Sequence, residues 1–96
     1  MDKNLIEFNK KFNLDIKPNI TKLVLRSKNI KCINYLQNLT LNELKELNLS
    51  DCGITDIKFL EKVKFDKLET LYLGGNKISN INILEKVNFN KLTYFI

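Results

Sequence analysis

The chain of 96 residues contains no histidine and no tryptophan, and only two cysteines. The absence of histidine removes the commonest general base and the commonest zinc ligand. Two cysteines cannot build a disulfide-rich scaffold, and without histidine neither can belong to a cysteine–histidine nucleophile. A single domain of this length also buries too little surface to hold a deep cleft between two lobes. The composition therefore argues against an enzyme, a cofactor and a metal centre.

Long apolar runs are also missing. No segment reaches the roughly 18 consecutive apolar residues that indicate a membrane-spanning helix. The N-terminus lacks the apolar run of about 7 to 15 residues that marks a secretory signal. We therefore expect no membrane association and a cytoplasmic, intracellular protein with reduced thiols.

The net charge is +5, from sixteen Lys and Arg against eleven Asp and Glu, but Arg26 is the single arginine. Recognition of phosphates and guanine edges favours arginine, because its planar fork binds in a bidentate way. Many of the lysines have an acidic neighbour, as Lys62 has in Glu61, and mixed charge of this kind is typical of a solvated face. The charge pattern therefore argues against a nucleic-acid partner.

The chain repeats itself every 24 residues. Residues 20–43, 44–67 and 68–91 align without a gap, the second and third units agree at 11 of 24 positions, and a partial fourth unit covers 92–96. Each unit opens with apolar residues two apart, which predicts a strand, and continues through turn-forming residues to apolar residues three apart, which predicts a short helix. Such units bury their apolar faces only by stacking. Two of the aligned apolar columns are Leu23/Leu47/Leu71/Phe95 and Leu25/Leu49/Leu73.

These units resemble the leucine-rich repeat family, whose pattern is L-x-x-L-x-L-x-x-N/C-x-L. The second unit meets the pattern with Leu44, Leu47, Leu49, Cys52 and Ile54, and the third with Leu68, Leu71, Leu73, Asn76 and Ile78. The first unit departs from it, because Lys28 occupies the Asn/Cys column. The Ile-x-x-Ile step that follows resembles the short-helix subclass of phosphatase-regulator-like and internalin-like repeats.

The resemblance implies an α/β fold. The expected architecture is a right-handed leucine-rich-repeat solenoid, with a parallel β-sheet on the concave face and short helical or 3₁₀ turns on the convex side. It also implies a non-catalytic protein-interaction module. The alternatives are a structural or self-associating fragment of a larger repeat protein, or a regulatory subunit of an enzyme such as a phosphatase, which is argued by analogy alone.

The Asn/Cys column has a physical role that the residues themselves indicate. A tight turn after a short parallel strand leaves backbone N–H and C=O groups inside the coil. The amide of Asn76 can donate and accept at once, so it can satisfy both kinds of group. Cys52 fits the same space but is a weaker donor and acceptor.

The two ends of the repeat array are expected to differ. Residues 1–19 form an amphipathic N-terminal cap, in which Leu5, Phe8 and Phe12 recur at helical spacing and Asp2 is the N-cap. The same helix could instead bind a membrane or a partner helix. At the other end, residues 92–96 form an exposed strand edge. This edge is consistent with a longer natural chain, with a homo-oligomer formed edge to edge, or with an edge tolerated because it is short.

Residues between the core leucines of each strand are expected on the concave face, where a protein or peptide partner would bind. These positions differ from unit to unit, as variable positions on a constant frame do, and they include tyrosine and arginine, which are enriched at interfaces. The alternative is a solvated sheet face. The predicted partner-binding residues are Lys22, Val24, Arg26, Glu46, Asn48, Ser50, Asp51, Thr70, Tyr72 and Tyr94.

Overall fold

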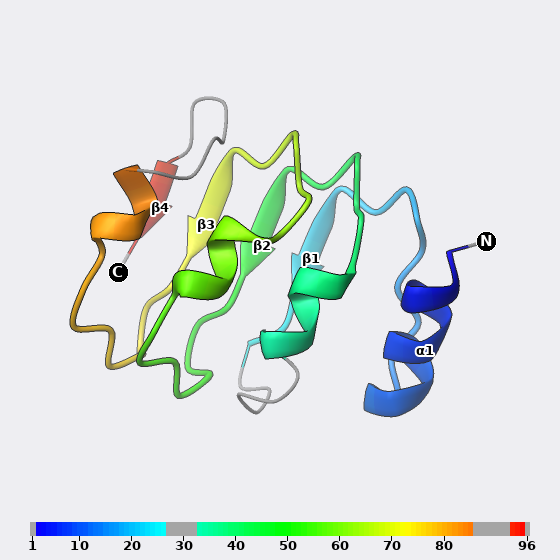
Figure 1. Cartoon of the computed structure of the whole chain (residues 1–96), viewed down its shortest axis with the longest axis horizontal. Helices are drawn as coiled ribbons and strands as arrows, with labels where there is room; N and C mark the ends of the chain where they lie inside the picture. Colours follow the sequence, from blue (N-terminus) through cyan, green and yellow to red (C-terminus); the bar gives the residue numbers. More distant parts are fainter. Residues whose placement is uncertain (1, 27–32, 86–92, 96) are drawn as a thin grey trace.

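The computed structural model describes residues 2–26, 33–85 and 93–95. In these ranges the chain forms one α-helix and then short parallel strands that alternate with 3₁₀ helices (Figure 1). The elements, in chain order, are α1 (Lys3–Phe12), β1 (Lys22–Val24), η1 (Tyr35–Asn38), β2 (Glu46–Asn48), η2 (Lys58–Glu61), β3 (Thr70–Tyr72), η3 (Asn82–Glu85) and β4 (Thr93–Phe95).

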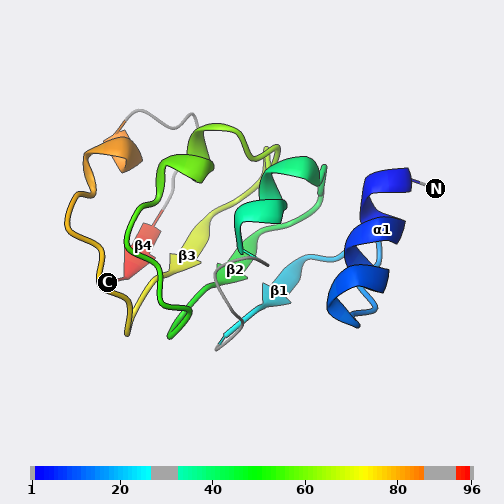
Figure 2. The same cartoon turned by 60° about the horizontal axis from the view of Figure 1, so that its bottom comes forward.

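The strands pair in the order in which they occur along the chain, and every pair is parallel. Lys22 pairs with Glu46 and Glu46 pairs with Thr70, an offset of 24 residues at each step. The strands lie on one side of the molecule and the 3₁₀ helices on the other (Figure 2). Each coil therefore consists of a strand, a turn, a 3₁₀ helix and a return segment, as the spacing of the apolar residues predicts.

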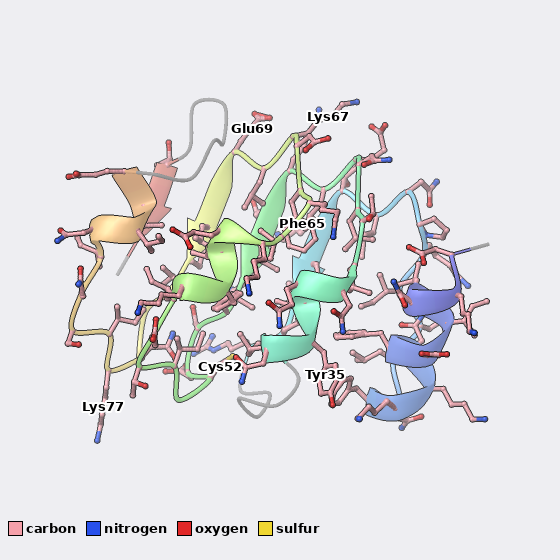
Figure 3. All side chains as sticks on the ribbon, viewed as in Figure 1. Tyr35, Cys52, Phe65, Lys67, Glu69 and Lys77 are labelled. Atoms are coloured by element: carbon pink, nitrogen blue, oxygen red, sulfur yellow. The ribbon has the colours of Figure 1, made fainter. Side chains whose placement is uncertain are left out.

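The apolar core fills the space between the sheet and the 3₁₀ helices. In each of β1, β2 and β3 the central leucine is buried and its two neighbours are more exposed, which is the alternation expected of a strand. Phe65 of a return segment is fully buried among these side chains (Figure 3). Burial of each leucine contributes roughly 1.5–3 kcal/mol relative to its exposure. The core leucines that lie in these strands or directly after them, none more than 4% exposed, are Leu23, Leu25, Leu47, Leu49, Leu71 and Leu73.

Helix α1 packs against the first coil, next to η1 (Figure 1). Its N-cap is Asp2, whose carboxylate accepts a hydrogen bond of 2.9 Å from the backbone N–H of Asn4. Leu5 and Phe8 are buried in the common core. The predicted helix and its N-cap are therefore confirmed.

The extended segment after α1 is held to the helix by a side chain that the sequence did not single out. The amide of Asn9 donates to the carbonyl of Ile16 and accepts from its N–H, both at 2.9 Å. Ile16 is thereby fixed with its side chain in the core. The pair of bonds ties the N-terminal helix to the chain that leads into β1.

Asn76 joins the second and third coils, as its position in the Asn/Cys column predicts. Its Oδ1 accepts from the backbone N–H groups of Cys52 and Ile54, at 2.9 and 3.0 Å. Its Nδ2 donates to the carbonyls of Leu49 and Leu73, both at 2.9 Å. One side-chain amide therefore satisfies four backbone groups that the strands leave behind.

Cys52 holds the corresponding position one coil earlier. Its thiol lies 3.0 Å from the carbonyl of Leu25, the same sequence separation as between Asn76 and Leu49. The thiol of Cys52 therefore donates to the carbonyl of Leu25 as the amide of Asn76 donates to the carbonyl of Leu49. Lys28, which holds this position in the first unit, lies outside the described residues, as does the second cysteine, Cys32.

Strand β4 is offset from the repeat by one residue. The 24-residue alignment predicts Phe95 opposite Leu71, but the structure pairs Tyr94 with Leu71 and Thr93 with Thr70, so the alignment is wrong at this strand. The hydrogen bond from the N–H of Thr93 to the carbonyl of Glu69, 2.7 Å long, fixes this register. Because side chains alternate along a strand, a slip of one residue exchanges the residues assigned to the two faces.

Candidate functional site

Two rows of outward-facing positions run across the sheet. The register places Lys22, Glu46, Thr70 and Thr93 in one row, and Val24, Asn48 and Tyr72 in the other. The buried leucines of the core lie between the rows and point the opposite way. Arg26 follows the C-terminal end of β1, and Ser50 and Asp51 follow that of β2. We define the sheet face as Lys22, Val24, Arg26, Glu46, Asn48, Ser50, Asp51, Thr70 and Tyr72.

Tyr94, which the sequence places on this face, does not share its rows. The register puts Tyr94 in the row of Leu71, which faces the core in β3, and puts Phe95 opposite Tyr72. The backbone therefore brings together all the predicted positions except that of Tyr94. This difference follows from the one-residue offset of β4.

The charges of the sheet face are paired with each other. Nζ of Lys22 lies 3.1 Å from Oε2 of Glu46, and Nε of Arg26 lies 3.1 Å from Oδ2 of Asp51. Both pairs join the first coil to the second. Their lysine and arginine side chains are well exposed, and such pairs contribute only about 0–1 kcal/mol of stability each. Their main effect is to leave the face without a surplus of either charge.

The row between the two ion pairs is less polar. Val24 is 51% exposed and Tyr72 of β3 is half-buried. Between them, the amide oxygen of Asn48 accepts from the N–H of Ser50 at 2.9 Å, so this oxygen is engaged by its own turn. The sheet face therefore presents the aliphatic side chain of Val24 and the aromatic side chain of Tyr72, with the amide of Asn48, already hydrogen-bonded to Ser50, between them.

On the opposite side of the molecule, shallow grooves lie along both sides of η2. The groove toward η1 has a volume of about 540 Å³ and includes Asp56, Lys58 and Glu61, and the groove toward η3, of about 600 Å³, shares these residues. Opposite charges alternate along both grooves. This surface has the character of a solvated face, as its sequence predicts.

The repeat pattern does not predict one cluster of side chains, formed by Lys11, Phe12 and Tyr35. Tyr35 of η1 lies beside α1 (Figure 3). Nζ of Lys11 lies 3.0 Å from the hydroxyl of Tyr35 and 4.3 Å from the centre of its ring, and the ring of Phe12 lies 5.6 Å from that ring. Tyr35 belongs to η1, and its partners belong to α1, a helix that is not part of the repeat. Because the contact joins a repeated segment to a unique one, periodicity cannot reveal it.

Over residues 2–26, 33–85 and 93–95, no group of acidic or cysteine side chains is arranged to hold a metal ion. The same ranges contain no helix with the length and apolarity needed to cross a membrane.

The comparison with protein families agrees with this geometry. Residues 42–86 match the family model of leucine-rich repeats, in two copies, and this segment contains β2, η2, β3 and η3. No curated protein and no solved structure matches the chain. Residues 42–86 thus consist of leucine-rich repeats. Repeats of this family generally mediate protein–protein interaction and are typically non-catalytic.

Proposed function

We propose that this chain is a non-catalytic interaction module and that a protein or peptide binds across its sheet face. The observation that carries the proposal is the row of Val24, Asn48 and Tyr72, in which an exposed aliphatic side chain on β1 and an aromatic side chain on β3 lie on either side of β2, between two internal ion pairs. Tyrosine and arginine are the residue types that most often dominate binding energy at protein interfaces. A partner of matching shape would bury this row and contact Arg26 at its edge.

The finer description of the fold is part of the same proposal. The sheet face is the concave face of a right-handed solenoid, the 3₁₀ helices are its convex side, and the repeats belong to the short-helix subclass. Residues 1–19 are its N-terminal cap, residues 20–96 its repeats, and the protein acts inside the cell. Stacked repeats of this kind offer an extended concave binding surface, which supports the choice of this face.

Affinity capture from the native cell tests the proposal. The bait is the wild-type chain, compared with the double variant Tyr72→Ala/Arg26→Ala and with Glu61→Ala/Lys62→Ala, a control with two exposed side chains at η2 on the opposite side. A partner retained by the wild type and the control but lost by the sheet-face variant is the expected result. The affinity of the recovered partner should fall at least tenfold, as for loss of an interface hot spot.

The melting temperature separates lost binding from lost folding. Tyr72 is half-buried, so its truncation could also lower stability. The single variant Val24→Asp is a second test, because Val24 is exposed and its replacement leaves the core leucines in place. If both variants melt like the wild type and bind the partner equally well, the sheet face is not the binding surface.

A further inference from the structure

The four charged side chains of the sheet face are not equally exposed. The side chain of Lys22 is 65% exposed and that of its partner Glu46 is 29% exposed. For Arg26 and its partner Asp51 the values are 63% and 44%. The sheet face is therefore neutral in total charge, but its cations are more open to solvent than its anions.

The hydrogen-bonding groups of the pairs show the same asymmetry. The carboxylate of Asp51 directs Oδ2 to Nε of Arg26 and lies in the space that a Cβ at Gly75 would fill. Among the described residues, Nε makes the one hydrogen bond of the Arg26 guanidinium, which has five N–H donors. The ammonium of Lys22 has three donors and contacts Glu46. At contact distance both pairs thus have donors left for a negatively charged group.

The exposed charges that flank the sheet face do not reverse this preference. Lys45 directly precedes β2 and Glu69 directly precedes β3, and the two are opposite in sign. Lys77, which follows the turn after β3, adds a positive charge. The surroundings therefore favour an anion as much as the face itself does.

The spacing of the sheet face matches alternate residues of an extended chain. Lys22, Val24 and Arg26 follow one another at intervals of two residues, and two residues of a strand advance about 6.6 Å. An extended peptide that lies along β1 advances by the same amount, so its side chains i, i+2 and i+4 meet the three positions in turn. A helix rises only about 5.4 Å per turn and loses this match by the third position.

The middle position favours an apolar side chain. Val24 is 51% exposed on β1, and Tyr72 lies on β3, two strands away. Between them, the amide oxygen of Asn48 is already bonded to the N–H of Ser50. Because neighbouring strands are about 4.8 Å apart, an aliphatic side chain placed above Asn48 would contact both Val24 and Tyr72.

We propose that the partner contributes an extended segment of the pattern acidic–x–apolar–x–acidic, which lies along β1 on the sheet face. Its two carboxylates pair with Lys22 and Arg26, and its apolar side chain lies between Val24 and Tyr72. This inference rests on the proposed function, because it uses the same face. No two acidic residues of the 96-residue chain are four positions apart, so a second copy does not offer this pattern.

Titration of the isotope-labelled chain with synthetic peptides, followed by NMR, tests the proposal. The probes are GSETLTEGS, its amide counterpart GSQTLTQGS and its serine counterpart GSETSTEGS. The acidic peptide GSETLTEGS should shift the backbone amides of 22–26 and 46–51, with a dissociation constant of roughly 0.1 to 1 mM, as expected of a small contact. Either counterpart should bind at least about threefold more weakly, because it lacks the exposed charge pairs or the apolar contact.

Neutral variants show which cations the peptide uses. Lys22→Gln and Arg26→Gln should each weaken binding of GSETLTEGS at least about threefold and leave that of GSQTLTQGS unchanged. Lys58→Gln is the matched control: it removes the same charge from an exposed position of η2, on the opposite side of the molecule, and should change neither affinity. Circular dichroism should show that all three variants are folded, as expected at exposed positions.

Three results would overturn the acidic pattern. One is equal affinity of the wild type for GSETLTEGS and GSQTLTQGS. Another is a loss of binding as large for Lys58→Gln as for Arg26→Gln, which would indicate attraction to the net charge of +5 alone. The third is an acidic peptide that shifts no amide of the sheet face.

The proposed function is tested separately from this pattern. A captured partner that requires Val24 and Tyr72 keeps the sheet face as the binding surface, even if the acidic and amide peptides bind equally well. A captured partner that binds the Val24→Asp variant and the wild type alike removes the proposed function, whatever the peptides do.

Discussion

The carboxylate of Asp51 lies against the Cα of Gly75, in the space that a side chain at position 75 would occupy. The two residues hold the same position in successive coils, and both have a left-handed backbone, with φ of 56° and 73°. From this place the carboxylate also pairs with Arg26. The absence of a Cβ at Gly75 thus lets one aspartate bridge three consecutive turns.

Gly75→Ala should therefore lower the free energy of unfolding by about 1–2 kcal/mol, because alanine is strained at positive φ and its Cβ would displace the Asp51 carboxylate. Chemical denaturation measures the change. Gly74→Ala is the control, since a Cβ there has no atom within 4 Å, and its effect should stay within about 0.5 kcal/mol. Equal stability of the two variants would contradict this account of the turn.

Asn76→Ala should cost about 1–3 kcal/mol of stability, because the four backbone groups bound by the amide lose their partner inside the coil. Thermal and chemical unfolding both report the loss. Asn82→Ala changes the same residue type at an exposed position of η3 and should have little effect. A melting curve for Asn76→Ala that matches the wild type would show that the ladder contributes nothing.

Leu5→Ala should destabilise the whole chain by about 2–4 kcal/mol, because it opens a cavity between α1 and the first coil. Its neighbour Ile6 is 48% exposed, and Ile6→Ala should change stability by no more than about 0.5 kcal/mol. The comparison is made by denaturant titration of both variants. If Leu5→Ala leaves the unfolding midpoint unchanged, α1 does not stabilise the end of the stack.

The sequence pattern predicted those parts of the fold that burial determines. Leu49 and Leu73 had to be inside, because a repeated pair of leucines two residues apart has one common face, and the position of Asn76 followed from the backbone groups that each turn leaves unpaired. The register of β4 could not be predicted in this way. The segment between β3 and β4 is one residue shorter than the repeat length requires, which the composition and the local propensities do not reveal. As a result Tyr94, and not Phe95, lies opposite Leu71.

The candidate site was predictable as a set of positions but not as a set of contacts. Strand alternation places Lys22 and Glu46 on one face, and register places them side by side. Asp51, which pairs with Arg26, has a left-handed backbone although it is not a glycine, and a periodic sequence pattern does not predict this conformation. Long-range contacts between unlike segments, such as Lys11 with Tyr35, are equally invisible to a repeat alignment.

The internal ion pairs of the sheet face also bear on how fast a partner can arrive. The charge of Lys22 is cancelled by Glu46, and that of Arg26 by Asp51. These four residues therefore exert little long-range attraction on a charged partner. For a partner docking there, these four charges add little to the association rate, and its dependence on ionic strength is set by the net charge of +5 of the whole chain. Differences in affinity among competing partners would then lie in how long each complex lasts.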